Sequence, residues 1–179
     1  NGDAYYAYTL QWHTTTAMTP DEVFKTGEAE VARIQNEMRA IMKKVNYKND
    51  SLLDFFEFVR NDPQFKYTND DKGRKEIVDD ANRYIDSMRV KLPELFGTLP
   101  KAPLVVKLVE PFREKSAGGA FYEDASEDGS RPGRYYVNTY NMDDEPKYQM
   151  EALAYHEAIP GHHMQISIAQ ELKNVPKFR

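Results

Sequence analysis

Residues 155–165 read YHEAIPGHHMQ, and this stretch decides how the chain is interpreted. Three of the chain's four histidines, His156, His162 and His163, fall within eight positions here, beside Glu157 and across a Pro-Gly pair. Imidazole and carboxylate groups clustered in this way are typical of a metal site. The question is whether this local backbone can bring them onto one ion.

A regular helix would keep these histidines apart. In the common HExxH pattern the two histidines are four residues apart, on one helix face and separated by roughly 6 Å of rise. His156 and His162 would instead lie roughly 120° apart around the axis and roughly 9 Å apart along it. His156 and His163 would share a face at a separation of roughly 10.5 Å. An undistorted helix therefore provides no site.

Pro160 and Gly161 predict a distortion at the required place. Proline has no N–H to donate to the carbonyl of His156, and its ring pushes against that carbonyl. Glycine accepts unusual backbone angles. A local loop or a π-like bulge that absorbs two residues would return His162 to the position of the second histidine in HExxH. The Pro-Gly pair therefore favours a metal site with an insertion.

Two alternatives stay open at this point. A kinked helix that merely ends in histidines is possible, because protonated histidine is favoured near a helix C-terminus; it leaves Glu157 without a role. The second ligand could be His162 or His163. We favour His162, with His163 as a group that supports the ligands or faces substrate.

The region from residue 19 to residue 97 is predicted to be helical. Thr19-Pro20-Asp21-Glu22 is a helix start with a capping box. An apolar stripe then follows at helical spacing: Val23, Gly27, Val31, Ile34, Met38, Ile41 and Val45. Ser51 predicts the start of a second helix, and Asp70 or Asp71 the start of a third that ends before Pro93.

The region from residue 103 to residue 140 is predicted to form a small, mostly antiparallel sheet. The β-branched run 104–109 is bounded by prolines, and 118–122 and 134–140 are further short strands. An active-site helix is expected over 144–172. The fold class is therefore α+β, mainly α-helical, with the sheet packed on a long metal-site helix in a single region, 1–179.

Composition excludes several classes of function. A net charge of −5 without a run of basic residues argues against a nucleic-acid surface. No stretch approaches the ~20 apolar residues of a membrane span. The absence of cysteine leaves only histidine and carboxylate as metal ligands. His13 is predicted to be structural, beside a strand end or turn at Thr14, Thr15 and Thr16.

Three strings together resemble a known family: YHEAIPGHHMQ, the preceding GGAFYEDASEDGSRPGRYYVNTYN, and YYAYTLQWHTTTAMTPDEVFKTGEAEVARI near the N-terminus. They are similar to the bacterial family called domain of unknown function 885, which is grouped with zincin-like metallopeptidases of the gluzincin type. The resemblance implies His156 and His162 as Zn²⁺ ligands. It implies Glu157 as the general base for a zinc-bound water, and a peptide as substrate.

The resemblance also implies features outside this sequence. Gluzincins take a third ligand, a glutamate, from an EGW-type motif on a later helix, and the single tryptophan here is Trp12. We therefore expect the chain to be a piece of a larger metallopeptidase catalytic domain, incomplete alone. Relatives often carry export or lipoprotein signals, so a periplasmic or membrane-anchored location is expected, with a cytoplasmic one left open.

Substrate contacts are expected at the sheet. The stretch Gly118, Gly119, Ala120, Phe121 and Tyr122 predicts an edge where a peptide adds as a strand, because glycines allow close backbone approach. An ordinary glycine turn is the alternative. The oxyanion could be stabilised by His163, Tyr122, Tyr136 or Tyr140, and the sequence does not choose among them.

The expected function is therefore a zinc-dependent hydrolase, with peptide-bond cleavage resting on the resemblance. One competing hypothesis is an inactive peptide-binding or scaffold module that retains the zincin helix. Glu157 favours the enzyme, because a binding module has no use for a general base. Another is a purely helical interaction domain, which leaves the histidine string as coincidence.

Overall fold

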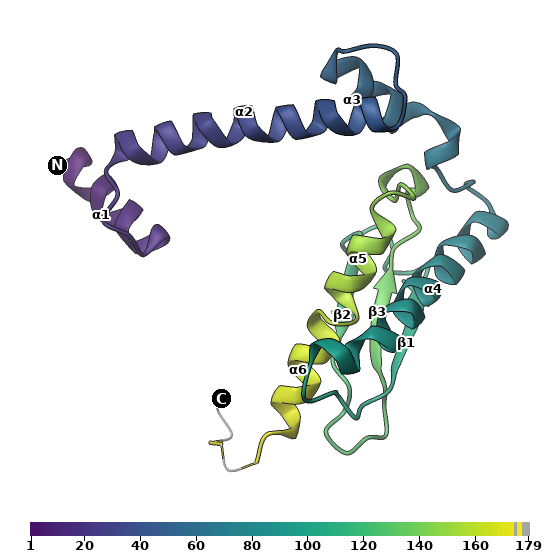
Figure 1. Ribbon diagram of the computed structural model, residues 1–179. Coiled ribbons are helices and arrows are strands. Elements are labelled where there is room, and N and C mark those ends of the chain that lie inside the picture. Colours follow the sequence, from purple (N-terminus) through teal and green to yellow (C-terminus); the bar gives the residue numbers. More distant parts are fainter. Residues whose placement is uncertain (174, 177–179) are drawn as a thin grey trace. The chain divides into compact units, whose positions relative to one another are not determined.

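A computed structural model describes residues 1–173 and 175–176 (Figure 1). The chain divides into two compact units, Asn1–Arg60 and Asn61–Arg179. The helices α1 (Gly2–Thr14), α2 (Pro20–Lys44) and α3 (Leu52–Asn61) build the first unit. The second unit holds α4, the three strands, α5 and α6, and it contains every residue of the histidine motif.

The start of α2 confirms the predicted capping box. Thr19 Oγ1 accepts the Glu22 N–H at 3.3 Å, and Glu22 Oε2 accepts the Thr19 N–H at 2.8 Å. The apolar stripe of α2 is largely exposed, as Val31 and Ile41 show at 55% and 52%. Within this unit the stripe therefore forms a surface and not a buried seam.

Helix α1 was not predicted. Its aromatic residues Tyr5, Tyr6, Tyr8 and Trp12 are all exposed, and the helix has no buried residue. The strand end expected at Thr14 is wrong, because the helix continues to that residue. The turn is confirmed, since Thr15 adopts the left-handed conformation at φ 55°.

In the second unit, α4 (Asp71–Leu95) follows a short 3₁₀ turn, η1 (Pro63–Phe65). Its buried face is Ile77, Ala81, Ile85 and Leu92, close to the predicted stripe. The expected end before Pro93 is wrong, because the helix runs on to Leu95. A proline so near the C-terminus removes one helical hydrogen bond, and burial of Leu92 holds this last turn against the core.

The sheet has three strands: β1 (Leu104–Leu108), β2 (Ala120–Glu123) and β3 (Gly133–Val137), in the order β1-β3-β2. β3 pairs with β1 in parallel and with β2 antiparallel. The sheet is therefore mixed, and the predicted mostly antiparallel arrangement is wrong. The reason is that β3 inserts between two strands that precede it in the chain. The outer edge of β2 carries no further strand within the described residues.

The two faces of the sheet have different surroundings. Tyr135 and Val137 point to the face covered by α4 and α5, where they join the core with Met142, Met150 and Ala154 (Figure 1). Tyr136, which lies between them in β3, points to the other face, because side chains alternate along a strand.

The single helix expected over 144–172 is not present. A 3₁₀ turn, η2 (Met142–Asp144), is followed by α5 (Met150–Glu157) and α6 (His162–Glu171) instead of one helix over 144–172. Segment 158–161 separates α5 from α6. No helix in the described part of the chain is both long and apolar enough to cross a membrane.

Candidate metal centre

The break between α5 and α6 absorbs the extra residues of the motif. The Gly161 N–H donates to the Tyr155 carbonyl at 2.9 Å, and the His163 N–H donates to the Ala158 carbonyl at 3.1 Å. These bonds span six and five residues, where a regular helix spans four. The local backbone is therefore wider than an α-helix, and the Ile159–Pro160 peptide bond within it is cis.

Gly161 is required here by close packing. A Cβ at this position would lie 1.8 Å from the carbonyl oxygen of His156 and 2.5 Å from that of Tyr155. Its φ of −68° is one that any residue can adopt. The glycine therefore serves to bring the start of α6 against the last turn of α5.

This break brings three predicted site residues together. Ligand atoms of His156, Glu157 and His162 all lie within 4.8 Å of one another. The two imidazole rings have centroids 4.8 Å apart and stand nearly perpendicular, at 88°. His162 Nε2 lies 3.9 Å from Glu157 Oε2. Among residues 1–173 and 175–176, no other set of histidine and carboxylate groups has this arrangement.

The three side chains differ in their access to solvent. His156 is exposed and His162 is half-buried, whereas Glu157 is buried, with 8% of its surface accessible. The site is therefore open on the side of the imidazoles, while the carboxylate is fixed in the wall formed by the end of α5.

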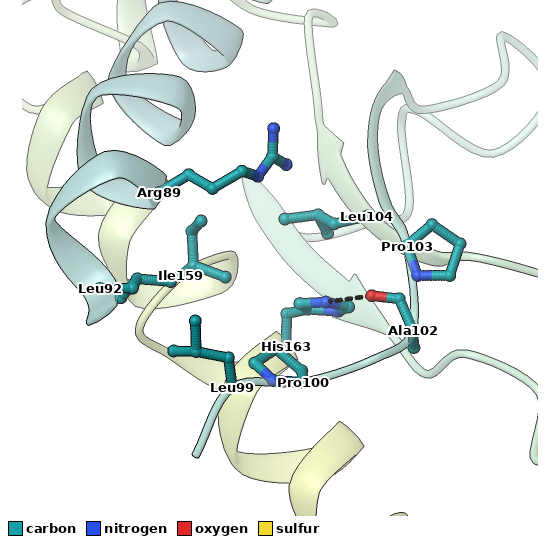
Figure 2. Close-up of a pocket in the computed structure, with 9 residues that line it drawn as sticks. All are labelled: Arg89, Leu92, Leu99, Pro100, Ala102, Pro103, Leu104, Ile159 and His163. Atoms are coloured by element: carbon teal, nitrogen blue, oxygen red, sulfur yellow. Dashed lines mark hydrogen bonds between the residues drawn. The ribbon is translucent and has the colours of Figure 1, made fainter. Parts of the chain in front are cut away.

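His163 lies elsewhere. Its ring is buried, and Nε2 donates to the Ala102 carbonyl at 3.1 Å, as Figure 2 shows in a pocket lined by residues of α4 and of the segment 99–104. Nδ1 then accepts from the Tyr122 hydroxyl at 2.9 Å. Burial lowers the pKa of this histidine. Both ring nitrogens are occupied, so the contacts fit the supporting role expected of His163 and leave no nitrogen for substrate.

The predicted substrate tyrosines are scattered. Tyr122 faces α6, and its hydroxyl is committed to His163. Tyr136 lies on the opposite face of the sheet, where its ring stacks on Phe121 at 5.0 Å between centroids and its hydroxyl donates to Glu110 at 3.4 Å. Tyr140 is exposed in the loop after β3. The structure does not bring these rings to one place.

The predicted glycine stretch lies at the start of the edge strand. Ala120 opens β2, and Gly119 continues the ladder by accepting the Asn138 N–H at 2.8 Å. The Asn138 side-chain amide donates to the Gly118 carbonyl at 3.1 Å. Helix α5 contacts β2. Among the described residues, no further strand pairs with the outer side of β2.

Two buried residues near this edge were missed. Glu145 is 5% exposed, and its Oε1 lies 2.9 Å from the place that a Cβ on Gly119 would occupy. Burial raises the pKa of Glu145 to about 7, and the charge of Asp144 adds to the effect. The sequence carried no signal for it, because an acidic residue before a proline is ordinary in a first helical turn.

Tyr135 is the other missed residue. It is fully buried, and its hydroxyl has no hydrogen-bond partner within the described part of the chain. Burial raises the pKa of Tyr135, and the charges of Glu145 and Glu157 raise it further. Tyr135 lies on the sheet face that α5 covers.

Comparison with known proteins gives a family but no activity. The family model described as "Bacterial protein of unknown function (DUF885)" matches residues 1–179. The crystal structure of "the putative lipoprotein from Colwellia psychrerythraea" is similar, with a TM-score of 0.80 and 31% identity. The match covers 95% of this chain and 29% of that one, so the chain spans less than a third of its relative. No curated protein matches.

The family model extends over the whole sequence, and the similar fold is shared with a protein of 31% identity. The chain belongs to the bacterial family of unknown function DUF885.

Proposed function

We propose that this chain carries the zinc ligands and the general base of a hydrolase, a zincin-like metallopeptidase. The observation that supports this most strongly is the convergence of His156, Glu157 and His162 across a break that no regular helix could bridge. Peptides as the substrate class, and a gluzincin-type arrangement, come from the resemblance of the motif.

The donor set fits zinc. Zinc takes imidazole nitrogen at roughly 2.0–2.1 Å, which puts two nitrogens of one tetrahedral site roughly 3.3 Å apart. The ligand atoms lie within 4.8 Å, so small rotations of the accessible His156 and His162 rings close the gap. If Glu157 acts as the base, this chain supplies two zinc ligands, His156 and His162. We propose a third, a glutamate outside this chain.

Glu157 is placed to move a proton. Bound zinc supplies Lewis acidity, which polarises a peptide carbonyl and acidifies water. The Glu157 carboxylate accepts a proton from the attacking water as the new C–O bond forms. The same carboxyl then donates that proton to the amine nitrogen as the C–N bond breaks. Its position beside His162, with Oε2 3.9 Å from Nε2, supports this role.

The free edge of β2 would hold the substrate. An extended peptide that pairs with an edge strand gains main-chain hydrogen bonds without a preformed pocket. Helix α5, which carries His156 and Glu157, contacts this strand. A peptide added there would run past the end of α5. Because the relative with a similar fold is described as a lipoprotein, we also propose a location outside the cytoplasm.

The test uses the longest form of the protein that its gene encodes, loaded with zinc and incubated with a mixture of peptides of known sequence. The wild-type protein should cleave, whereas Glu157→Gln should bind zinc equally well and lose at least 100-fold in rate. The matched control is Glu127→Gln, an exposed loop position that should leave the rate unchanged. Peptide binding without cleavage by the wild-type protein would contradict the enzyme and support a binding module.

A further inference from the structure

A pocket of about 410 Å³ lies wholly within the second unit, lined by residues of α4, of the segment 99–104 and of the break before α6 (Figure 2). Most of its wall is apolar and is formed by Leu92, Leu99, Pro100, Pro103, Leu104 and Ile159. A volume near the lower end of the roughly 300–1,000 Å³ of known ligand sites suits a small molecule. None of the lining residues belongs to the candidate metal centre, so the pocket is a separate site.

The pocket has one charged side chain, Arg89. Figure 2 shows this side chain extending from α4 towards the side of the pocket where Leu104 begins β1. The other polar side chain in the wall is His163, whose Nε2 donates to the Ala102 carbonyl and whose Nδ1 accepts from Tyr122. This ring is therefore neutral and has no N–H left to donate. A molecule in the pocket meets a single positive charge.

Part of the Arg89 guanidinium is available to a ligand. Its Nη1 lies 2.7 Å from Asp86 Oδ1, in a surface pair whose side chains are 54% and 68% exposed. Such exposed pairs contribute little to stability. Within the part of the chain that the structure describes, no acceptor contacts Nε or Nη2 of Arg89. These two nitrogens form one edge of the guanidinium, and their N–H groups match the two oxygens of a carboxylate.

The rest of the wall selects the kind of anion. Pro100 and Pro103 have no N–H, and the Ala102 carbonyl already accepts from His163. A phosphate group carries more charge and more acceptor oxygens, and it is usually held by several donors. A carboxylate is satisfied by one arginine edge. No acidic side chain lines the pocket, so an ammonium group on the same ligand would lack a partner.

We propose that this pocket binds a small carboxylate that carries an apolar body and no amine. Its charge pairs with the Nε and Nη2 edge of Arg89, and its body packs against Leu99 and Leu104. Free short-chain carboxylic acids have this chemistry, and so does the C-terminal apolar residue of a peptide. The inference goes beyond the proposed hydrolase and does not depend on zinc.

The test is calorimetric titration of the full-length, metal-free protein, so that a carboxylate cannot bind to zinc instead. Isocaproate should bind at least tenfold more tightly than its uncharged amide, because a hydrogen-bonded charge pair is lost in the amide. It should also bind more tightly than acetate, which lacks the body, and than leucine, which adds an amine. N-acetyl-leucine represents a peptide C-terminus: tighter binding than isocaproate would identify a peptide end as the source, and weaker binding a free acid.

Two variants locate the binding. Arg89→Gln should weaken isocaproate binding at least tenfold and leave amide binding unchanged. Leu99→Trp, at a lining position that is 37% exposed, should fill the pocket and weaken both ligands. The matched control is Arg83→Gln, because Arg83 also lies on α4, pairs with Asp80 three residues before it and is 58% exposed. It should bind like the wild-type protein.

Three results would overturn the proposal. The first is no binding of isocaproate by the wild-type protein, which would mean that the pocket is filled or serves packing alone. The second is equal affinity for the acid and the amide, or an unchanged preference for the acid in Arg89→Gln. The third is unchanged isocaproate binding in Leu99→Trp, which would place the anion on the surface around Arg89. Thermal unfolding of each variant confirms that it is folded.

Discussion

Gly161 lies directly against the carbonyl oxygen of His156, so close that a Cβ on the glycine would be 1.8 Å from that oxygen. This contact joins the last turn of α5 to the residue that directly precedes α6. It lets a motif with two additional residues bring His156 and His162 together. The candidate metal centre therefore depends on a backbone contact, and not only on its ligands.

Gly161→Ala should disrupt this arrangement. The added methyl group cannot fit, so the segment 158–161 must move, at a cost of roughly 2 kcal/mol or more in the free energy of unfolding. Zinc affinity should fall at least tenfold. Gly97→Ala is the control, because nothing lies within 4 Å of its Cβ position. Urea unfolding and zinc titration of both variants test the prediction, and equal zinc affinity in Gly161→Ala would contradict it.

His163 should prove structural. His163→Ala leaves the Tyr122 hydroxyl and the Ala102 carbonyl without their partner and opens a cavity, at a cost of roughly 3 kcal/mol. The folded variant should still bind zinc. His13→Ala, at an exposed position, should change stability by less than about 0.5 kcal/mol. A stable His163→Ala protein that has lost zinc would instead identify His163 as the ligand.

Glu145 should make stability depend on pH. Its pKa is raised from 4.5 to about 7 by burial, so the folded state retains the proton more strongly than the unfolded state. Its contribution to stability is fully present below pH 4.5 and is lost as pH rises through 7. Over this pH range, the contribution of Glu145 to the free energy of unfolding falls by an amount on the order of 3 kcal/mol.

Urea unfolding of metal-free wild-type and Glu145→Gln proteins at pH 5 and pH 8 measures this effect. The variant should lose the corresponding part of the pH dependence and gain stability relative to the wild type at pH 8. Glu127→Gln should follow the wild type at both values. A difference between wild type and Glu145→Gln that does not change with pH would show that Glu145 is not protonated by burial.

The sequence predicted the elements whose signals are local. The capping box at Thr19 and Glu22, the apolar face of α4 and the run that forms β1 each depend on neighbouring residues. The distortion at Pro160 and Gly161 was predicted for the same reason. A local loop or a bulge was expected there, and the structure has a loop, which divides the helix expected over 144–172 into α5 and α6.

The missed features depend on contacts between distant residues. Glu145 becomes distinctive only because it is buried against Gly119, which is far from it in sequence. The side of the sheet on which Tyr136 lies follows from strand register, which one sequence does not reveal. The burial of His163 depends on its contacts with Ala102 and Tyr122, which are also far from it in sequence.

The most direct test of the account is zinc content by elemental analysis after zinc loading and dialysis, in the longest form that the gene encodes. The wild-type protein and His13→Ala should each hold about one zinc ion per chain, and His156→Ala and His162→Ala should lose it while remaining folded by circular dichroism. A wild-type protein without zinc, or unchanged zinc in both His156→Ala and His162→Ala, would contradict the metal centre and leave the motif as a broken helix that ends in histidines.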